Sequence, residues 1–119
     1  MNNNFDYTQY KHFFFVGIGG TGMSAIAQYL KGLGKEVSGS DRLFKPEQKM
    51  LIQEQFEKMG IQCFNQDASG VTSDVDVLVI STAIEETNVE LQKAKILNIP
   101  VVKRSELLAS ISAPNAPSP

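Results

Sequence analysis

The chain has 119 residues, 42% of them hydrophobic, and its 11 basic and 13 acidic side chains leave a formal net charge of −2. This length suits one domain with a buried core, and the charge excludes the dense positive field of proteins that bind nucleic acids or anionic membranes. No apolar run approaches the roughly 20 residues that span a bilayer, and residues 1–6 lack the pattern of a signal peptide. The single cysteine excludes an internal disulfide, so a cytoplasmic location is expected.

The first half of the chain predicts a buried strand followed by an amphipathic helix. Residues 1–10 are polar and are expected to fray. The run HFFFV at residues 12–16 is apolar without alternation, which is typical of a strand buried on both faces. Apolar residues then recur at helical spacing from Met23 to Leu33, and Gly34 follows as a helix-ending residue.

Further strands are predicted where short apolar or β-branched runs end in polar turns: residues 36–41, 61–64, 75–80 and 100–102. Pro46 fits the first turn of a helix that ends at Gly60, and Thr87 with Glu90 is expected to form a capping box for the next helix. A last short helix is expected over residues 105–111. Six side chains are expected to face the core from the middle two helices: Ile52, Phe56, Met59, Leu91, Ala94 and Leu97.

Strands and helices therefore alternate along the chain with short connections. This order predicts an α/β, Rossmann-like domain with about five parallel strands, right-handed crossovers and helices on both faces of the sheet. We expect the domain to cover residues 1–111. Residues 112–119 hold three of the five prolines without periodicity, which is typical of a linker or a truncated tail.

A glycine-rich turn joins the first strand to the first helix: Gly17-Ile18-Gly19-Gly20-Thr21-Gly22. Glycines 17, 19 and 22 match the pattern G-x-G-x-x-G. They would allow a tight turn, close approach of a phosphate to the backbone and close packing of the helix on the sheet, in that order. The first helical amides lie at the positive end of the helix dipole and favour an anion. The alternative is a turn that only connects strand and helix.

Two other segments follow predicted strands, and in open α/β sheets the ligand lies beyond the carboxyl ends of the strands. Asp41 ends the second strand, where the acidic residue of a dinucleotide site accepts a ribose hydroxyl; alternatively it caps the next helix. Arg42 either pairs with a phosphate or is simply exposed. Ser81 and Thr82 follow the fourth strand and could bond a base or sugar, or merely satisfy a turn.

Other reactive residue types point to no catalytic centre. His12 lies at the start of the first strand and is expected to be structural, and Cys63 is expected to be a small buried side chain. One histidine and one cysteine cannot form a zinc site, so no metal is expected. The glycine turn continues as Met23-Ser24 and therefore lacks the lysine of a phosphate loop that binds ATP.

Four blocks of the sequence resemble the N-terminal domain of the Mur ligase family over roughly residues 12–111: VGIGGTGMSAIA (16–27), EVSGSD (36–41), VLVISTAI (77–84) and IPVVKRSELL (99–108). The resemblance implies a five-stranded Rossmann-like domain that binds the UDP part of UDP-N-acetylmuramate or a related UDP-sugar. It implies that ATP, Mg²⁺ and L-alanine are bound by other domains of a full-length, ATP-dependent amide-forming ligase. The domain alone is then inactive, with no catalytic residue and no cofactor of its own.

The resemblance also implies roles for individual residues. The diphosphate would face the backbone of four residues: Ile18, Gly19, Gly20 and Thr21. Asp41, with Ser40 and Arg42 beside it, would take the ribose or uracil. The uridine pocket would be walled by Ser81, Thr82 and Ala83. After the third strand this chain has Asn65-Gln66-Asp67-Ala68, where the family often has a histidine.

Two other function classes remain open from the residues themselves. The glycine turn and Asp41 also fit an NAD-binding Rossmann domain of an oxidoreductase or sensor. A nucleotide-gated interaction domain without enzymatic activity is the third reading. The ligand distinguishes the first two, because one domain binds a uridine diphosphate and the other an adenine dinucleotide.

Overall fold

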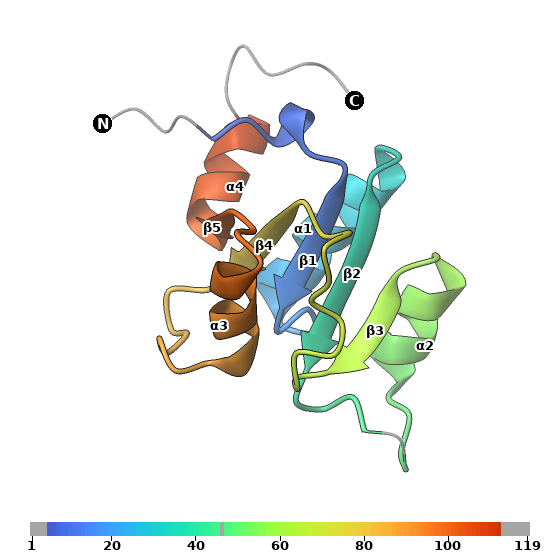
Figure 1. The fold of residues 1–119 in the computed structure, drawn as a ribbon. Helices are drawn as coiled ribbons and strands as arrows, with labels where there is room; N and C mark the ends of the chain where they lie inside the picture. The colour runs from blue at the N-terminus through green and yellow to red at the C-terminus, as the bar shows by residue number, and fades with distance from the viewer. Residues whose placement is uncertain (1–4, 46, 113–119) are drawn as a thin grey trace.

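The five strands in residues 5–45 and 47–112, the part of the chain that the computed structural model describes, form one parallel sheet (Figure 1). Its strand order is β3-β2-β1-β4-β5. The strands are β1 (His12–Val16), β2 (Glu36–Asp41), β3 (Gln62–Asn65), β4 (Val77–Ile80) and β5 (Val101–Lys103). The helices are the 3₁₀-helix η1 (Tyr7–Gln9), α1 (Thr21–Gly32), α2 (Leu51–Lys58), α3 (Val89–Ile96) and α4 (Arg104–Ser112). The predicted α/β class with five parallel strands is confirmed.

The central strand β1 is buried on both faces, as its continuous apolar run predicts. It pairs with β2 on one side and β4 on the other, and Phe13, Phe14 and Phe15 are each fully buried. Successive side chains of a strand point to opposite faces. Phe13 and Phe15 therefore enter one core cluster, and Phe14 enters the other.

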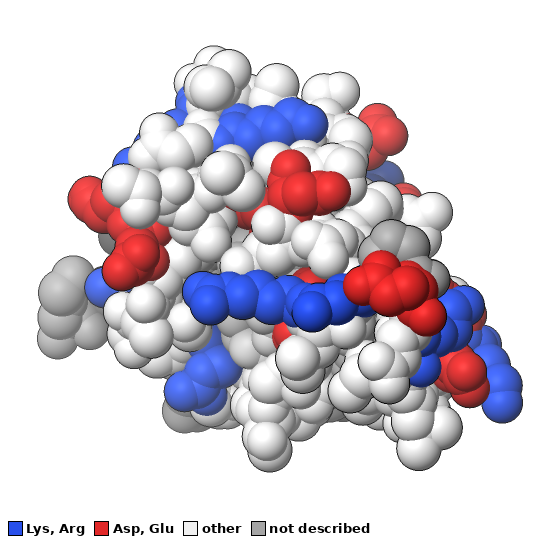
Figure 2. All heavy atoms as spheres, turned by 90° about the horizontal axis from the view of Figure 1, so that it is seen from below, with Lys and Arg blue, Asp and Glu red and all other residues white. Residues whose placement is uncertain are grey.

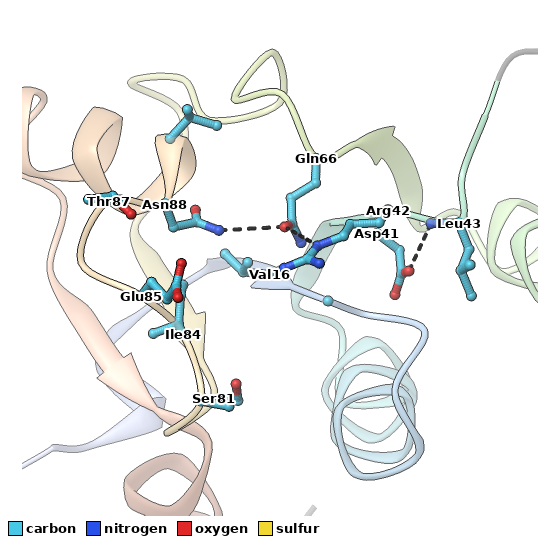
Figure 3. A pocket seen from close by; sticks show the side chains of 13 residues that line it. Val16, Asp41, Arg42, Leu43, Gln66, Ser81, Ile84, Glu85, Thr87 and Asn88 are labelled. Carbon is cyan, nitrogen blue, oxygen red and sulfur yellow. Dashed lines mark hydrogen bonds between the residues drawn. The ribbon is translucent and has the colours of Figure 1, made fainter.

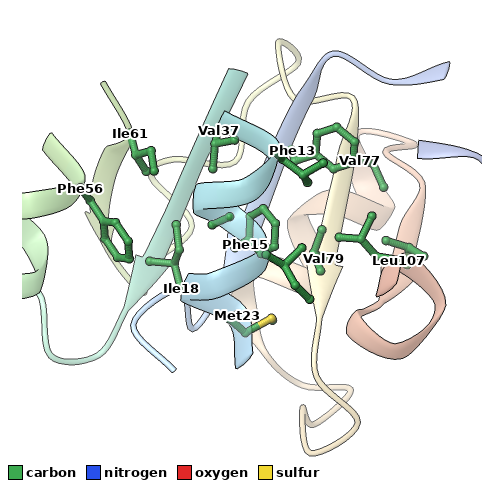
Figure 4. Close-up of a cluster of buried hydrophobic side chains, with 14 of the residues drawn as sticks. Phe13, Phe15, Ile18, Met23, Val37, Phe56, Ile61, Val77, Val79 and Leu107 are labelled. Atoms are coloured by element: carbon green, nitrogen blue, oxygen red, sulfur yellow. The ribbon is translucent and has the colours of Figure 1, made fainter. Parts of the chain in front are cut away.

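Helices cover both faces of the sheet. The larger cluster, part of which Figure 4 shows, joins the strands to α1, α2, α4 and η1. The smaller cluster packs α3 and the loop over residues 66–76 against the opposite face, and Val71 and Val75 anchor that loop. The link from β3 to β4 is therefore this loop and contains no helix.

Helix α2 begins later than the sequence predicts. It starts at Leu51, while Pro46 lies outside the described residues. The chain first turns after β2, where the amide of Phe44 donates to the carbonyl of Asp41 and the Phe44 ring is buried. Of the three side chains expected in the core, Phe56 is fully buried, Ile52 is half-buried and Met59 is 39% exposed.

The predicted capping box at α3 is wrong by one residue. Asn88 is the N-cap, and its side-chain oxygen accepts from the amides of Glu90 and Leu91. The carboxyl group of Glu90 is fully buried and bonds elsewhere, so it does not close a box with Thr87. Leu91 and Ala94 of α3 are buried as expected, whereas Leu97 lies just past the helix and is 38% exposed.

The ends of the chain differ in part from expectation. Tyr7, expected to fray, lies in η1, is buried, and donates its amide hydrogen to Ser110 Oγ on α4. That contact holds η1 against α4. Ser112 still belongs to α4, and the remainder of the predicted linker falls outside the described residues.

Candidate functional site

A pocket of about 890 Å³ opens at the carboxyl edge of the sheet, where ligands bind in open α/β folds (Figure 3). Its walls come from the ends of β1 to β4 and from the start of α3. It is lined by Val16, Gly17, Asp41, Arg42, Leu43, Gln66, Ser81, Ala83, Ile84, Glu85, Thr87, Asn88 and Val89. The volume falls within the range of small-molecule sites.

The glycine turn is held against the end of β2. Gly17 has φ +79°, a conformation that favours glycine, which confirms its predicted role in the tight turn. The amides of Gly17 and Ile18 both donate to the carbonyl of Ser40, at 2.8 and 2.9 Å. The Ile18 side chain is fully buried. Within the first half of the turn, Ile18 is therefore part of the core, whereas Gly17 lines the pocket.

Asp41 joins the glycine turn to the turn after β2. Its Oδ2 accepts from the Gly19 amide at 2.9 Å, and its Oδ1 accepts from the Leu43 amide at 3.1 Å. A β-carbon on residue 19 would lie 2.8 Å from Asp41 Oδ2. The absence of a side chain at Gly19 therefore makes room for this carboxylate, while Asp41 also lines the pocket.

The remaining amides of the turn divide into bonded and free groups. The Gly20 amide donates to the carbonyl of Gly17 at 3.1 Å. The amides of Thr21 and Gly22 open α1 and find no acceptor within the described residues. Both residues are exposed, so these amides form the accessible positive end of the α1 dipole.

Arg104, which sequence reasoning missed as a site residue, lies beside this end of α1. A β-carbon on residue 22 would meet Arg104 Nη1 at 3.2 Å, and its three nearest atoms all belong to Arg104. The predicted role of Gly22, close packing of the helix on the sheet, is therefore wrong, because it leaves space for Arg104. Arg104 directly follows the observed β5 but comes two residues after the predicted strand 100–102, so its place near a strand end was only an approximate signal in the sequence.

Three polar side chains are joined across the pocket by two long hydrogen bonds. Gln66 Oε1 accepts from Asn88 Nδ2 and from Arg42 Nε, each at 3.5 Å (Figure 3). Arg42 is exposed, and Gln66 and Asn88 are half-buried. Sequence reasoning missed Gln66 and Asn88 as pocket residues; Gln66 lies two residues after the predicted strand 61–64 and directly follows the observed β3.

Ser40 lies behind the pocket, not in it. It is fully buried, and its hydroxyl donates to Glu90 Oε1. Glu90 Oε2 accepts from the amide of Ala68 at 3.3 Å. Burial raises the pKa of the Glu90 carboxyl to about 7, and the nearby Asp67 charge adds to this shift.

The predicted segment after β4 divides in the same way. Ser81 and Ala83 line the pocket with Ile84 and Glu85. Thr82 is exposed and is not among the lining residues. The structure thus brings Gly17, Asp41, Arg42, Ser81 and Ala83 together around one cavity, and it leaves Thr82 outside.

The residues that were expected to be structural lie away from this edge. The ring nitrogens of His12, at the start of β1, bond Ser38 Oγ at 2.8 Å and the carbonyl of Asp74 at 3.1 Å. Cys63 is half-buried, and burial raises the pKa of its thiol to about 12. A thiol in that state is a poor nucleophile.

The surface at the pocket edge carries both charge signs. Figure 2 views the molecule from below, toward the ends of the strands, and shows basic and acidic side chains scattered over a mostly uncharged surface.

Among residues 5–45 and 47–112, no group of three or more histidine, cysteine, aspartate or glutamate side chains is arranged to hold a metal ion. None of the helices in these two ranges is long and apolar enough to cross a membrane.

A Rossmann-like sheet with a glycine turn and a pocket at its carboxyl edge defines a class of nucleotide-binding domains. Residues 12–115 match the Mur ligase family, catalytic domain, so the chain belongs to the Mur ligase family. The UDP-N-acetylmuramate–L-alanine ligase of Dichelobacter nodosus is 45% identical over 101 residues, which are 85% of this chain and 20% of that protein. The chain thus spans about a fifth of the length of the curated relatives it matches.

Solved structures show the same relationship. The UDP-N-acetylmuramate–alanine ligase of Thermotoga maritima matches 82% of this chain and 21% of its own, with 28% identity and a TM-score of 0.70. A UDP-N-acetylmuramate:L-alanyl-γ-D-glutamyl-meso-diaminopimelate ligase from Neisseria meningitidis matches 87% of this chain and 31% of its own, with 28% identity and a TM-score of 0.72. Both support the Rossmann-like fold in a Mur ligase setting.

Proposed function

We propose that this chain binds the UDP part of UDP-N-acetylmuramate, within a longer UDP-N-acetylmuramate–L-alanine ligase of peptidoglycan synthesis. The observation that carries the proposal is the pocket at the carboxyl edge of the sheet, bordered by the glycine turn and by Asp41. The identity of the nucleotide is inferred from the names of two relatives, 45% and 42% identical to this chain, which are UDP-N-acetylmuramate–L-alanine ligases. The name of the Neisseria structure suggests a variant of this proposal, in which the same UDP-N-acetylmuramate is joined to a peptide instead of L-alanine.

The diphosphate is proposed to lie at the start of α1. Thr21 and Gly22 offer unbonded amides there, and Arg104 adds a guanidinium group. The amides of Ile18 and Gly19 already donate to Ser40 and Asp41, so a phosphate gains them only by displacing those bonds. The expected phosphate contact therefore narrows to the second half of the turn.

The uridine is proposed to occupy the pocket itself. Ser81, Ala83 and Ile84 form one wall, and Asp41 lies opposite them on β2 with an acceptor for a ribose hydroxyl. The hydrogen-bonded side chains of Arg42, Gln66 and Asn88 cross this space. Because these hydrogen bonds are long, they are easily exchanged for hydrogen bonds to a base.

The remaining chemistry is assigned to the rest of the longer protein. There ATP with Mg²⁺ would activate the substrate carboxylate as an acyl phosphate, and the amine of L-alanine would attack it. This domain would contribute orientation, because holding the nucleotide fixes the distant carboxylate relative to the ATP site. A cytoplasmic location belongs to the same proposal and is supported by the single free thiol of Cys63.

Calorimetric titration of the purified chain with UDP-N-acetylmuramate, UDP and NAD tests the proposal. We expect heat of binding with the two uridine ligands and no ATPase or ligase turnover. Ala83→Phe places a large ring in the pocket and should abolish binding. Ala109→Phe is the matched control at an exposed position of α4 outside the pocket lining, and it should bind normally.

Three other results of these measurements would contradict or change the proposal. Binding of NAD alone would contradict the proposal and assign the domain to the adenine dinucleotide binders. Equal binding by the wild type and Ala83→Phe would place the uridine outside this pocket. Turnover by the purified chain would show that catalytic groups lie within these 119 residues.

A further inference from the structure

Glu90 is the only fully buried carboxyl group among the described residues. It lies in the first turn of α3, two positions after the N-cap Asn88. Its carboxyl oxygens bond a hydroxyl and an amide, and neither of these partners is a cation. A buried carboxyl group without a cationic partner is costly to ionise, and the function proposed above gives it no role.

The bonds of Glu90 join the three segments that build the pocket. Ser40 belongs to β2, and its carbonyl fixes the amides of Gly17 and Ile18 in the glycine turn. Ala68 lies two residues after Gln66 of the pocket wall and has φ +72°, a strained conformation for a residue with a side chain. Glu90 itself follows the lining residues Asn88 and Val89. Moving any one of these segments disturbs the other two.

We propose that Glu90 is a positioning residue for nucleotide binding, which acts through Ser40 and Ala68 and links the affinity for an anionic ligand to pH. The inference rests on the proposed function, because it takes the ligand to be a diphosphate near the glycine turn. The neutral carboxyl group favours that ligand. Its ionised form places an unscreened negative charge behind the same turn and opposes it.

The charged groups around Glu90 support this direction. Asp67, on the loop that carries Ala68, faces it with a second negative charge. Lys93, one turn further along α3, donates to the carbonyl of Ala68 at 3.1 Å and does not bond Glu90. On β2, Asp41 directly follows Ser40 and bonds the glycine turn. Burial and Asp67 together raise the pKa of Glu90 to about 7, which places its ionisation near neutral pH.

Glu90→Gln separates position from charge. A glutamine amide can donate to Ser40 Oγ, and its oxygen can still accept from the Ala68 amide, so the variant keeps the geometry of the neutral acid. Glu86→Gln is the matched control, because Glu86 is an exposed carboxylate of the loop before α3. His12→Gln is a second control at the opposite edge of the sheet.

The experiment is calorimetric titration with UDP-N-acetylmuramate at pH 6, 7 and 8. The diphosphate of this probe is substituted at both ends and has no proton to lose in that range. We expect wild-type affinity to fall about fivefold from pH 6 to pH 8, the lower end of typical coupling between separate sites. Glu90→Gln should bind as tightly as the wild type at pH 6 and should show no loss of affinity at pH 8. Both control variants should lose affinity with pH as the wild type does. An equal fall in Glu90→Gln would overturn the proposal.

A ligand-free measurement separates this inference from the proposed function. In nuclear magnetic resonance spectra of the wild type, the amides of Gly17, Ile18 and Ala68 should shift between pH 5 and 9 with one shared midpoint. Amides that do not move would overturn the inference, whether or not Glu90→Gln folds. If the wild type binds no uridine ligand at any pH, the proposed function fails, and this titration alone decides whether Glu90 ties the three segments together.

Discussion

Replacing Gly39 by alanine tests how the glycine turn is held. Gly39 lies on β2, and a β-carbon there would come within 2.7 Å of Ile18 Cβ, Ile18 Cδ1 and the carbonyl oxygen of Phe15. Ordinary contact begins near 3.4 Å, so the added methyl group needs about 0.7 Å of movement in a close-packed core. The Phe15 carbonyl belongs to the central strand, so it cannot yield without disturbing the sheet. Relieving all three contacts therefore requires Ile18 to move, and the glycine turn with it, and also requires β1 and β2 to shift relative to each other.

The expected cost is that of overpacking, about 1–3 kcal/mol of unfolding free energy. Urea unfolding followed by circular dichroism measures it, with the slope of the transition as a check on two-state behaviour. Gly32→Ala is the matched control, because residue 32 ends α1 and a β-carbon there meets nothing within 4 Å. Alanine should stabilise that position by about 0.5–1 kcal/mol. If Gly39→Ala is as stable as the wild type while the control behaves as expected, Ile18 does not pack on β2 in the way described.

Three further predictions concern single side chains. Asn88→Ala should cost about 1 kcal/mol in urea unfolding, because it removes the N-cap of α3, whereas Thr87→Ala should be nearly neutral; the reverse order would restore the capping box. Cys63, with its pKa raised to about 12, should react with iodoacetamide much more slowly at pH 8 in the native protein than in urea, and equal rates would contradict its burial. The folded-state pKa of Glu90 is raised from 4.5 to about 7. The stability of the fold that depends on a neutral Glu90 is therefore complete below pH 4.5 and is lost as the pH rises to 7. Relative to Glu90→Gln, the wild type should therefore lose on the order of 3 kcal/mol between pH 4 and 8, and parallel pH profiles would contradict this.

The parts of the fold that depend on local pattern were predictable from the sequence. β1 and β2 have the predicted bounds, and Gly34 and Gly60 take positive φ values just after α1 and α2. The start of α2 was not predictable in this way, because Phe44 turns into the core and delays the helix. β3 begins one residue later than predicted, and β4 begins two residues later. Pairing with the neighbouring strands, and not amino-acid composition, determines where these strands begin.

The candidate site was predictable where its residues lie at strand ends: Asp41 is the last residue of β2, and Ser81 directly follows β4. The bonds between segments were not, because they join residues far apart in the sequence. Arg104 reaches Gly22 across 82 positions of chain, and Glu90 reaches Ser40 across 50. Glu90 also fitted a local capping pattern that concealed its buried role.

Chemical-shift mapping would show directly whether a uridine diphosphate sugar binds at the carboxyl edge of this sheet. ¹⁵N-labelled protein would be titrated with UDP-N-acetylmuramate and its amide signals followed. We expect the largest shifts at Thr21, Gly22, Gln66 and Ala83, with no change at His12 on the opposite edge. Shifts confined to any other surface, or saturation by NAD at these positions without any response to the uridine ligand, would contradict this expectation.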